Sequence, residues 1–170
     1  MKYISLLVLM ILAVACHSPK AKEFNTLIDS ADRKAFVILV ADSSEDVRLQ
    51  ALINRKAVTA IKVATDQANQ LKSLITEIES FPVTEISDAK RLKQSTAAYY
   101  KLLLQLKNLD IREAQLMAGT LDQNSGEAKK AQDDMSALRN ERVKTYKLVN
   151  QSEQEKYKAK LAFQKNNHLQ

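Results

Sequence analysis

The sequence predicts an all-α protein, built as an elongated up-down bundle of three to four long antiparallel helices. Its 170 residues include only two glycines and two prolines, while the strong helix formers Ala, Leu, Lys, Gln and Glu fill long stretches. Apolar residues recur at three- and four-residue steps. The predicted connections at 81–84 and 121–126 are short, so neighbouring helices have to run antiparallel. We expect one helical domain over 23–165, followed by a frayed tail at 166–170.

Residues 1–15 have the pattern of an export signal. Lys2 precedes a run without charge from Ile4 to Ala15. A helix needs about 20 apolar residues to span a bilayer, so this run is too short for an anchor helix and suits the apolar region of a signal peptide. Cleavage before Cys16 would remove it from the fold.

The segment Leu12-Ala13-Val14-Ala15-Cys16 resembles the lipobox of bacterial lipoproteins. The resemblance implies that Cys16 carries diacylglycerol and anchors the protein to the cell membrane or outer membrane, facing the periplasm or the cell surface. Most lipoproteins have Leu where this chain has Ala13, and Ala13-Val14-Ala15 also fits the A-x-A pattern of ordinary signal peptidase. That alternative leaves Cys16 as a reactive thiol, and acylation gives the single cysteine a role, so we expect lipidation.

The first helix is predicted over about 23–40. Residues 16–22 contain a proline and no apolar period, which indicates a lipidated cysteine and a short tether. Phe24, Leu27, Ile28, Ala31 and Ala35 follow helical spacing, and the run AFVILVA that ends the helix predicts burial on all sides. Asp42 and Glu45 form a capping-box pattern, so we expect a new helix there. Whether residues 23–80 form one helix or two stays open, because no glycine or proline interrupts them.

Two further helices follow from their apolar stripes. The second should end at Ser80, because Phe81-Pro82 disfavours helix, and the third follows Thr84 and reaches Gly119. The expected core positions of the second helix are Ile53, Ala57, Ile61, Ala64, Ala68, Leu71, Ile75 and Ile78, and those of the third are Ile86, Ala89, Leu92, Tyr99, Leu103, Leu106 and Leu109.

A turn is predicted at 122–126 and a last helix over 127–165. This last helix has the thinnest apolar stripe, made of Ala128, Ala131, Met135, Leu138, Tyr146, Val149, Tyr157 and Leu161. The first helix is the shortest, so one end of the bundle is expected to be a three-helix section with exposed apolar surface, where a partner would bind.

No catalytic chemistry is indicated. Metal sites in helical bundles use inward-facing Glu and His, but His17 and His168 lie near the ends of the predicted mature chain. Gly119 and Gly126 do not form a phosphate-binding loop. A serine nucleophile would lack a histidine base. We therefore expect no catalytic residues, no metal and no cofactor. The net charge of +6 comes without any nucleic-acid motif, so nucleic acid is not an expected partner.

Phe24-Asn25 and Tyr99-Tyr100 resemble marks of small helical bacterial surface lipoproteins of unassigned function. The resemblance implies helical architecture and supplies no catalytic residues. The predicted function is a lipid-anchored, non-catalytic interaction or structural module of the cell envelope, with Phe36, Tyr99 and Tyr100 as candidate binding residues and an envelope protein as candidate partner. The alternative is a periplasmic carrier or chaperone-like binder of an apolar ligand or client. Oligomeric state is left open, although the thin last stripe speaks against further coiled-coil pairing.

Overall fold

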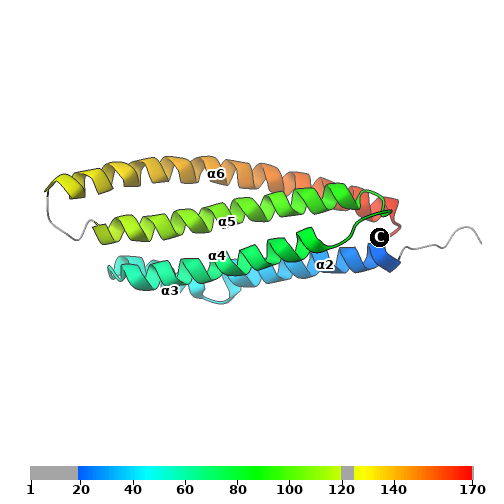
Figure 1. Ribbon diagram of the computed structural model, residues 1–170, viewed down its shortest axis with the longest axis horizontal. Helices are drawn as coiled ribbons and strands as arrows, with labels where there is room; N and C mark the ends of the chain where they lie inside the picture. Colours follow the sequence, from blue (N-terminus) through cyan, green and yellow to red (C-terminus); the bar gives the residue numbers. More distant parts are fainter. Residues whose placement is uncertain (1–18, 120–124, 170) are drawn as a thin grey trace, which may run out of the picture.

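The protein is an elongated antiparallel bundle with four arms (Figure 1). The computed structural model describes residues 19–119 and 125–169, and all regular structure within these ranges is helical. In Figure 1, α2, η1 and α3 follow one another in the same direction, and α4, α5 and α6 then alternate in direction. The all-α bundle is therefore confirmed. Its elements are α2 (Pro19–Phe36), the π-helix η1 (Val37–Ala41), α3 (Ser44–Ile53), α4 (Ala57–Ser80), α5 (Ala89–Gly119) and α6 (Ser125–Asn166).

The first arm is built from three segments. A new helix does begin after Asp42, whose Oδ1 accepts a hydrogen bond from the Ser44 N–H at 2.9 Å. The predicted capping box is wrong, because Ser43 is the N-cap residue and the Glu45 carboxylate binds Arg48 instead. The chain also does not reverse here. Because α3 continues the line of α2, the first arm runs alongside the whole of α4, and the expected three-helix section is absent from the described bundle.

The chain reverses at residues 54–56, inside the stretch that the sequence predicted as continuous helix. The Lys56 N–H donates to the Ala51 carbonyl at 2.7 Å, and the Arg55 N–H donates to the Leu52 carbonyl at 3.0 Å. Arg55 has a φ of 55°. This pair of bonds around a left-handed residue is the Schellman motif, which usually employs glycine at that position. Because arginine stands here in place of glycine, the sequence pattern did not predict the end of α3.

Several helix ends match the prediction and two segments correct it. The second long helix ends at Ser80 and the third at Gly119, as expected. In contrast, α2 begins at Pro19, so residues 19–22 are helical and do not belong to a tether. Proline is favoured in the first helical turn because its missing N–H would have no partner there. Of the predicted turn at 122–126, residues 122–124 lie outside the described residues, and α6 has already begun at Ser125.

The C-terminal tail is docked, which corrects the expectation of fraying. Asn166 Nδ2 donates to the Asp88 carboxylate, and Asn167 Nδ2 donates to the Ser87 carbonyl at 2.9 Å. Leu169 packs against the hydrophobic core. These contacts tie the end of α6 to the connection between α4 and α5. Gln170 lies outside the described residues.

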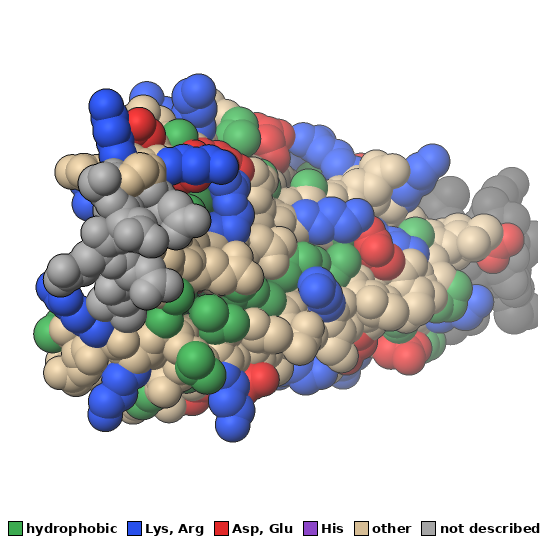
Figure 2. Space-filling model, turned by 60° about the vertical axis from the view of Figure 1, so that its left-hand side comes forward, with side chains coloured by type: hydrophobic (Ala, Val, Ile, Leu, Met, Phe, Trp, Pro, Cys, Tyr) green, Lys and Arg blue, Asp and Glu red, His purple; other side chains and the backbone are tan. Residues whose placement is uncertain are grey.

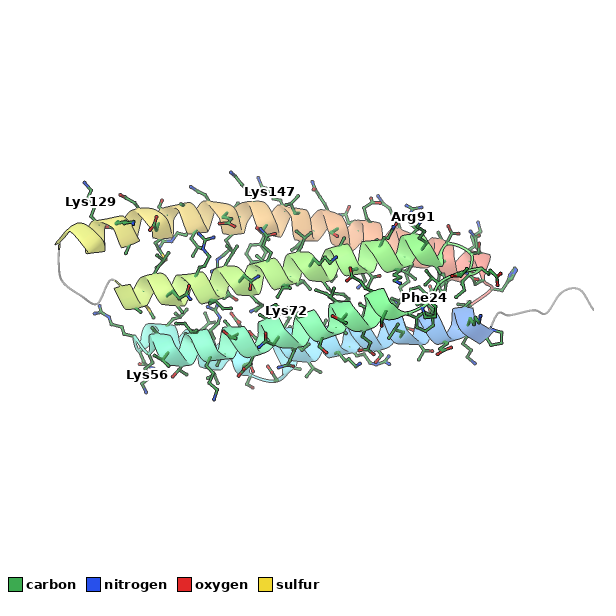
Figure 3. All side chains as sticks on the ribbon, viewed as in Figure 1. Phe24, Lys56, Lys72, Arg91, Lys129 and Lys147 are labelled. Carbon is green, nitrogen blue, oxygen red and sulfur yellow. The ribbon has the colours of Figure 1, made fainter. Side chains whose placement is uncertain are left out.

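Three phenylalanine rings meet in the core at the end of the bundle where α2 begins. Phe24 is fully buried between Phe81, at a ring-centroid distance of 5.1 Å, and Phe163, at 5.6 Å. Figure 3 labels Phe24 at this end. The main core of 21 buried residues draws on α2, α4, α5 and α6, whereas α3 packs on a separate small cluster of Ala51, Ala60 and Ala114. The α3 half of the bundle is thus poor in large buried side chains.

Several predicted core positions are exposed. Ile53 is 72% exposed because it ends α3 at the reversal, and Tyr157 is 61% exposed. Tyr146 and Leu161 are also exposed, whereas Ala131, Leu138 and Val149 of the predicted stripe are buried as expected. The buried face of α6 is completed by Thr145, Ala159 and Phe163, which the prediction did not include. The run AFVILVA is not buried on all sides: only Ala35 and Ile38 are buried, while Phe36, Val37 and Val40 are exposed. Figure 2, in which the α3 end comes forward, shows hydrophobic side chains exposed among charged ones.

Candidate functional site

Tyr100 is the fully buried member of the predicted tyrosine pair. Its hydroxyl donates to Asp32 Oδ1 at 2.5 Å, which joins α5 to α2 across the bundle. Tyr99 is half-buried beside it, with the two ring centroids 5.2 Å apart. The helix places consecutive residues 100° apart, so one ring enters the core and the other borders it.

Two lysines of α6 complete this cluster. Lys156 Nζ donates to Asp32 and lies over both tyrosine rings, 4.7 Å from the Tyr99 centroid and 5.3 Å from the Tyr100 centroid. Lys160 Nζ lies 2.6 Å from Asp29 Oδ1 and 3.5 Å from Asp32 Oδ2. A cation held over an aromatic face is itself a favourable contact. The protein's own lysine therefore occupies the position that a cationic ligand would take over these rings.

Burial and mutual contacts shift the pKa values of three groups in this cluster, Asp32, Tyr100 and Lys160. Burial disfavours ionisation of Asp32, but the hydrogen bonds from Lys156 and Tyr100 outweigh it and lower the pKa of the carboxyl group. Burial, followed by the hydrogen bond to Asp32, raises the pKa of Tyr100 far above its usual value. Burial lowers the pKa of Lys160 in isolation, but Asp29 and Asp32 reverse the effect and raise it. At neutral pH the Tyr100 hydroxyl therefore donates to an ionised Asp32 carboxylate, and the contacts of Asp32 join α2, α5 and α6.

A second polar cluster, which sequence analysis missed, lies in the α3 half of the bundle. Asp110 on α5 is only 3% exposed, and its carboxylate lies 2.5 Å from Arg142 Nη1, 2.9 Å from Lys107 Nζ and 3.8 Å from Arg48 Nε. Glu113 Oε2 lies 2.9 Å from Arg142 and 3.4 Å from Arg48. The cluster joins α3, α5 and α6. We name its six members the ion cluster: Glu45, Arg48, Lys107, Asp110, Glu113 and Arg142.

The charges of the ion cluster balance, with three cations and three carboxylates. The Glu45 carboxylate accepts from Arg48 Nη2 at 2.6 Å and from Lys107 Nζ at 2.9 Å. Burial opposes ionisation of Glu45, yet the hydrogen bonds from Arg48 and Lys107 lower its pKa to about 2. Buried charges need such mutual pairing to offset their lost hydration. Few large apolar side chains hold α3 to the rest of the bundle, and the ion pairs of this cluster take their place.

One sequence signal could have located the ion cluster. Asp110 stands seven residues after Leu103 and four after Leu106, so it falls on the same face of α5 as the predicted apolar stripe. A charged residue in register with a buried stripe needs a partner of opposite charge in the core. Arg48 and Arg142 cannot be assigned to it from spacing, since they come from other helices.

Phe36 marks an exposed apolar surface at the junction of α2 and η1. Its side chain is 59% exposed, and Val37 and Val40 lie exposed in the following π-helix. Gln67 on α4 donates from Nε2 to the Ile38 carbonyl at 2.7 Å and so fixes η1 to the bundle. The Asp42 N–H bonds the Val37 carbonyl, five residues back, which is the π-helical pattern. Single π-turns of this kind occur frequently at functional sites.

An open groove of about 470 Å³ lies beside this surface, between α2 with η1 on one side and α4 on the other. Val37, Ile38 and Leu74 contribute its apolar lining, and the ion pair between Lys34 and Glu77 crosses it at 2.7 Å. Its remaining lining residues are Ser30, Arg33, Gln70 and Ser73. The groove can accept an apolar side chain flanked by polar groups.

Cys16, the expected lipidation site, lies outside the described residues, as does His17. Among residues 19–119 and 125–169 the structure contains no group of His, Cys, Asp and Glu side chains suited to holding a metal ion. Within these same ranges, no helix combines the length and the apolar character needed to cross a membrane.

Comparisons of the chain with protein-family models, with curated proteins and with solved structures found no match.

Proposed function

We propose that this chain is a lipid-anchored protein of the bacterial cell envelope, acting as a non-catalytic interaction or structural module. The observation that carries the proposal is the uncharged run from Ile4 to Ala15, followed at once by the chain's only cysteine. Diacylglycerol on Cys16 with an amide-linked acyl chain buries many methylenes, each contributing about 0.8 kcal/mol, which exceeds the marginal hold of a single chain.

The start of α2 at Pro19 supports this reading. Three residue steps separate Cys16 from Pro19, a span of at most about 11 Å. The folded bundle would therefore begin directly at the lipid headgroups, without a long linker. Such a protein searches for partners in two dimensions at the membrane surface.

The two polar clusters favour a structural over a catalytic role. In each cluster the described carboxylates are engaged by cations of other helices, for example Asp32 by Lys156 and Asp110 by Arg142. Catalytic acids and bases need a proton affinity matched to the working pH, whereas the pKa shifts of Asp32 and Tyr100 run away from neutrality. The surface at Phe36 is the candidate contact for an envelope protein.

The anchor is tested by Cys16→Ser, with Ser18→Ala as the matched control that keeps the cysteine. We expect the mature protein to move from the membrane fraction to the soluble fraction in Cys16→Ser only. Retention of Cys16→Ser in the membrane fraction, at the wild-type level, would contradict lipid anchoring.

The interaction role is tested by photocrosslinking in cells from Phe36, with Lys130 on the exposed face of α6 as control position. A discrete protein captured from Phe36 and not from Lys130 is the expected result. Lipid adducts at Phe36 would instead favour the carrier alternative, and the absence of any adduct would favour a purely structural role.

A further inference from the structure

One end of the bundle collects four chain segments around the start of α2. In Figure 1 this end holds the first turns of α2 and α5, the connection between α4 and α5, and the last turns of α6. We name it the near end. The contacts of Asn166 with Asp88 and of Asn167 with Ser87 join the end of α6 to the connection between α4 and α5. Gln164 Nε2 of α6 donates to Asn25 Oδ1 of α2 at 3.1 Å. These segments therefore form one continuous surface.

The near end carries unpaired cations. Within residues 19–119 and 125–169, the structure gives no ion-pair partner to Lys20, Lys22, Lys90 or Lys165, and all four are exposed. Arg91, labelled at this end in Figure 3, is exposed and lies 3.9 Å from Glu155. Of the exposed carboxylates beside them, Glu77 pairs with Lys34 and Glu79 with Lys101. Among the residues that the structure describes, Glu23, Glu85 and Asp88 have no ion-pair partner, and Asp88 accepts a hydrogen bond from Asn166. The four unpaired lysines therefore outnumber the three unpaired carboxylates at this surface.

We propose that the near end docks onto anionic phospholipid headgroups and holds the bundle upright on the membrane. The proposal rests on the lipid anchor at Cys16 proposed above, because the short span to Pro19 brings this end, and no other, within reach of the headgroups. Anionic headgroups attract basic residues lying within a Debye length of the surface, about 10 Å, which covers the span available. Gln132 lies 34 residues before the end of α6, which places it about 50 Å from the near end. In an upright bundle it is therefore held about that far from the headgroups.

The alternative orientation is a bundle lying on its side. The exposed residues Val143, Tyr146, Tyr157 and Leu161 of α6 would be the apolar contacts of such a state. In that orientation both ends of α6 lie close to the bilayer, so label positions at the two ends of the bundle discriminate between the two states.

The test uses the full lipidated protein, purified from membranes and reconstituted into vesicles whose headgroups chelate nickel. A nitroxide is attached at Thr84→Cys, in the connection at the near end, or at Gln132→Cys near the far end, and its relaxation by the nickel is measured. Both positions are exposed. We expect strong relaxation at Thr84→Cys and little at Gln132→Cys in vesicles containing phosphatidylglycerol. Equal relaxation at both positions would overturn the proposal.

The charge contribution is tested by comparing K20Q/K22Q/K90Q with K129Q/K130Q/K144Q, which removes the same charge from the other part of the bundle, where Figure 3 labels Lys129. The ratio of docked to undocked protein should fall about fivefold for each near-end lysine removed. It should stay unchanged in the control variant. Relaxation that is insensitive to K20Q/K22Q/K90Q and to replacing phosphatidylglycerol with phosphatidylcholine would show that the anchor alone sets the orientation.

A mass spectrum of the purified protein separates the two proposals. Protein that carries diacylglycerol but shows no preference between the labels refutes the docking proposal and leaves the anchor intact. Protein without diacylglycerol on Cys16 refutes both.

Discussion

Arg142 Nη1 on α6 lies 2.5 Å from Oδ1 of Asp110 on α5, and this contact belongs to a cluster that also holds α3. Because the small core beneath α3 consists mainly of alanines, the charged residues contribute much of what fixes this helix to the bundle.

Removing the Asp110 carboxylate should therefore strongly reduce the free energy of unfolding. Asp110→Ala leaves Arg48, Lys107 and Arg142 without their shared partner in a buried position, and losses of this kind reduce the free energy of unfolding by about 3 to 5 kcal/mol. Urea unfolding followed by circular dichroism measures the change. As control, Glu141→Gln removes the exposed partner of Arg112 and should cost less than about 1 kcal/mol. Equal effects of the two variants would contradict a special role for the ion cluster.

The Tyr100 hydroxyl should contribute measurably to stability. Tyr100→Phe removes the hydrogen bond to Asp32 while keeping the buried ring, and should lower the free energy of unfolding by about 1 to 2 kcal/mol. Tyr99→Phe is the matched control and should change it little, since the structure gives the Tyr99 hydroxyl no hydrogen-bond partner among the described residues. A larger loss for Tyr99→Phe would refute the assignment.

Stability should depend on pH through Glu45. Its pKa falls from 4.5 to about 2 on folding, so the folded state binds fewer protons than the unfolded state between these values. The contribution is complete above about pH 5 and is lost as the pH falls toward 2. Glu45→Gln should flatten the dependence of the urea midpoint on pH in this window. An unchanged slope would show that the Glu45 contacts do not persist in solution.

Replacing Arg55 by glycine at the chain reversal should stabilise the protein. A non-glycine residue at a φ of 55° costs on the order of 1 kcal/mol. Arg55→Gly should therefore raise the free energy of unfolding by about 0.5 to 1 kcal/mol, whereas Arg55→Ala, which keeps a Cβ, should not. A destabilised Arg55→Gly variant would mean that the Arg55 side chain has a stabilising role of its own.

The periodicity of single helices was readable from the sequence. The stripe of α4 from Ala57 to Ile78 and the proline after Phe81 predicted the end of this helix at Ser80, which the structure confirms, but not its start at Ala57. These features act through local geometry, because each helix has to bury one face and proline disfavours helix in the residue before it. The same logic misplaced Tyr146 and Tyr157, since the apolar residues of α6 are few and two faces compete for burial.

Only the tertiary structure decided where the chain turns back and what holds α3. Arg55 adopts the left-handed conformation because the packing of α3 against α4 outweighs the conformational free energy that this costs. Arginine is not a residue type from which such a conformation can be predicted. Likewise, Asp110 signals a buried charge by its position in the α5 stripe, but its partners Arg48 and Arg142 come from helices far away in the sequence. The sequence by itself determined an all-α antiparallel bundle, since helical periodicity and short connections are local properties. Ion pairs between helices depend on which residues the folded chain brings close together, and the tertiary structure alone determines this.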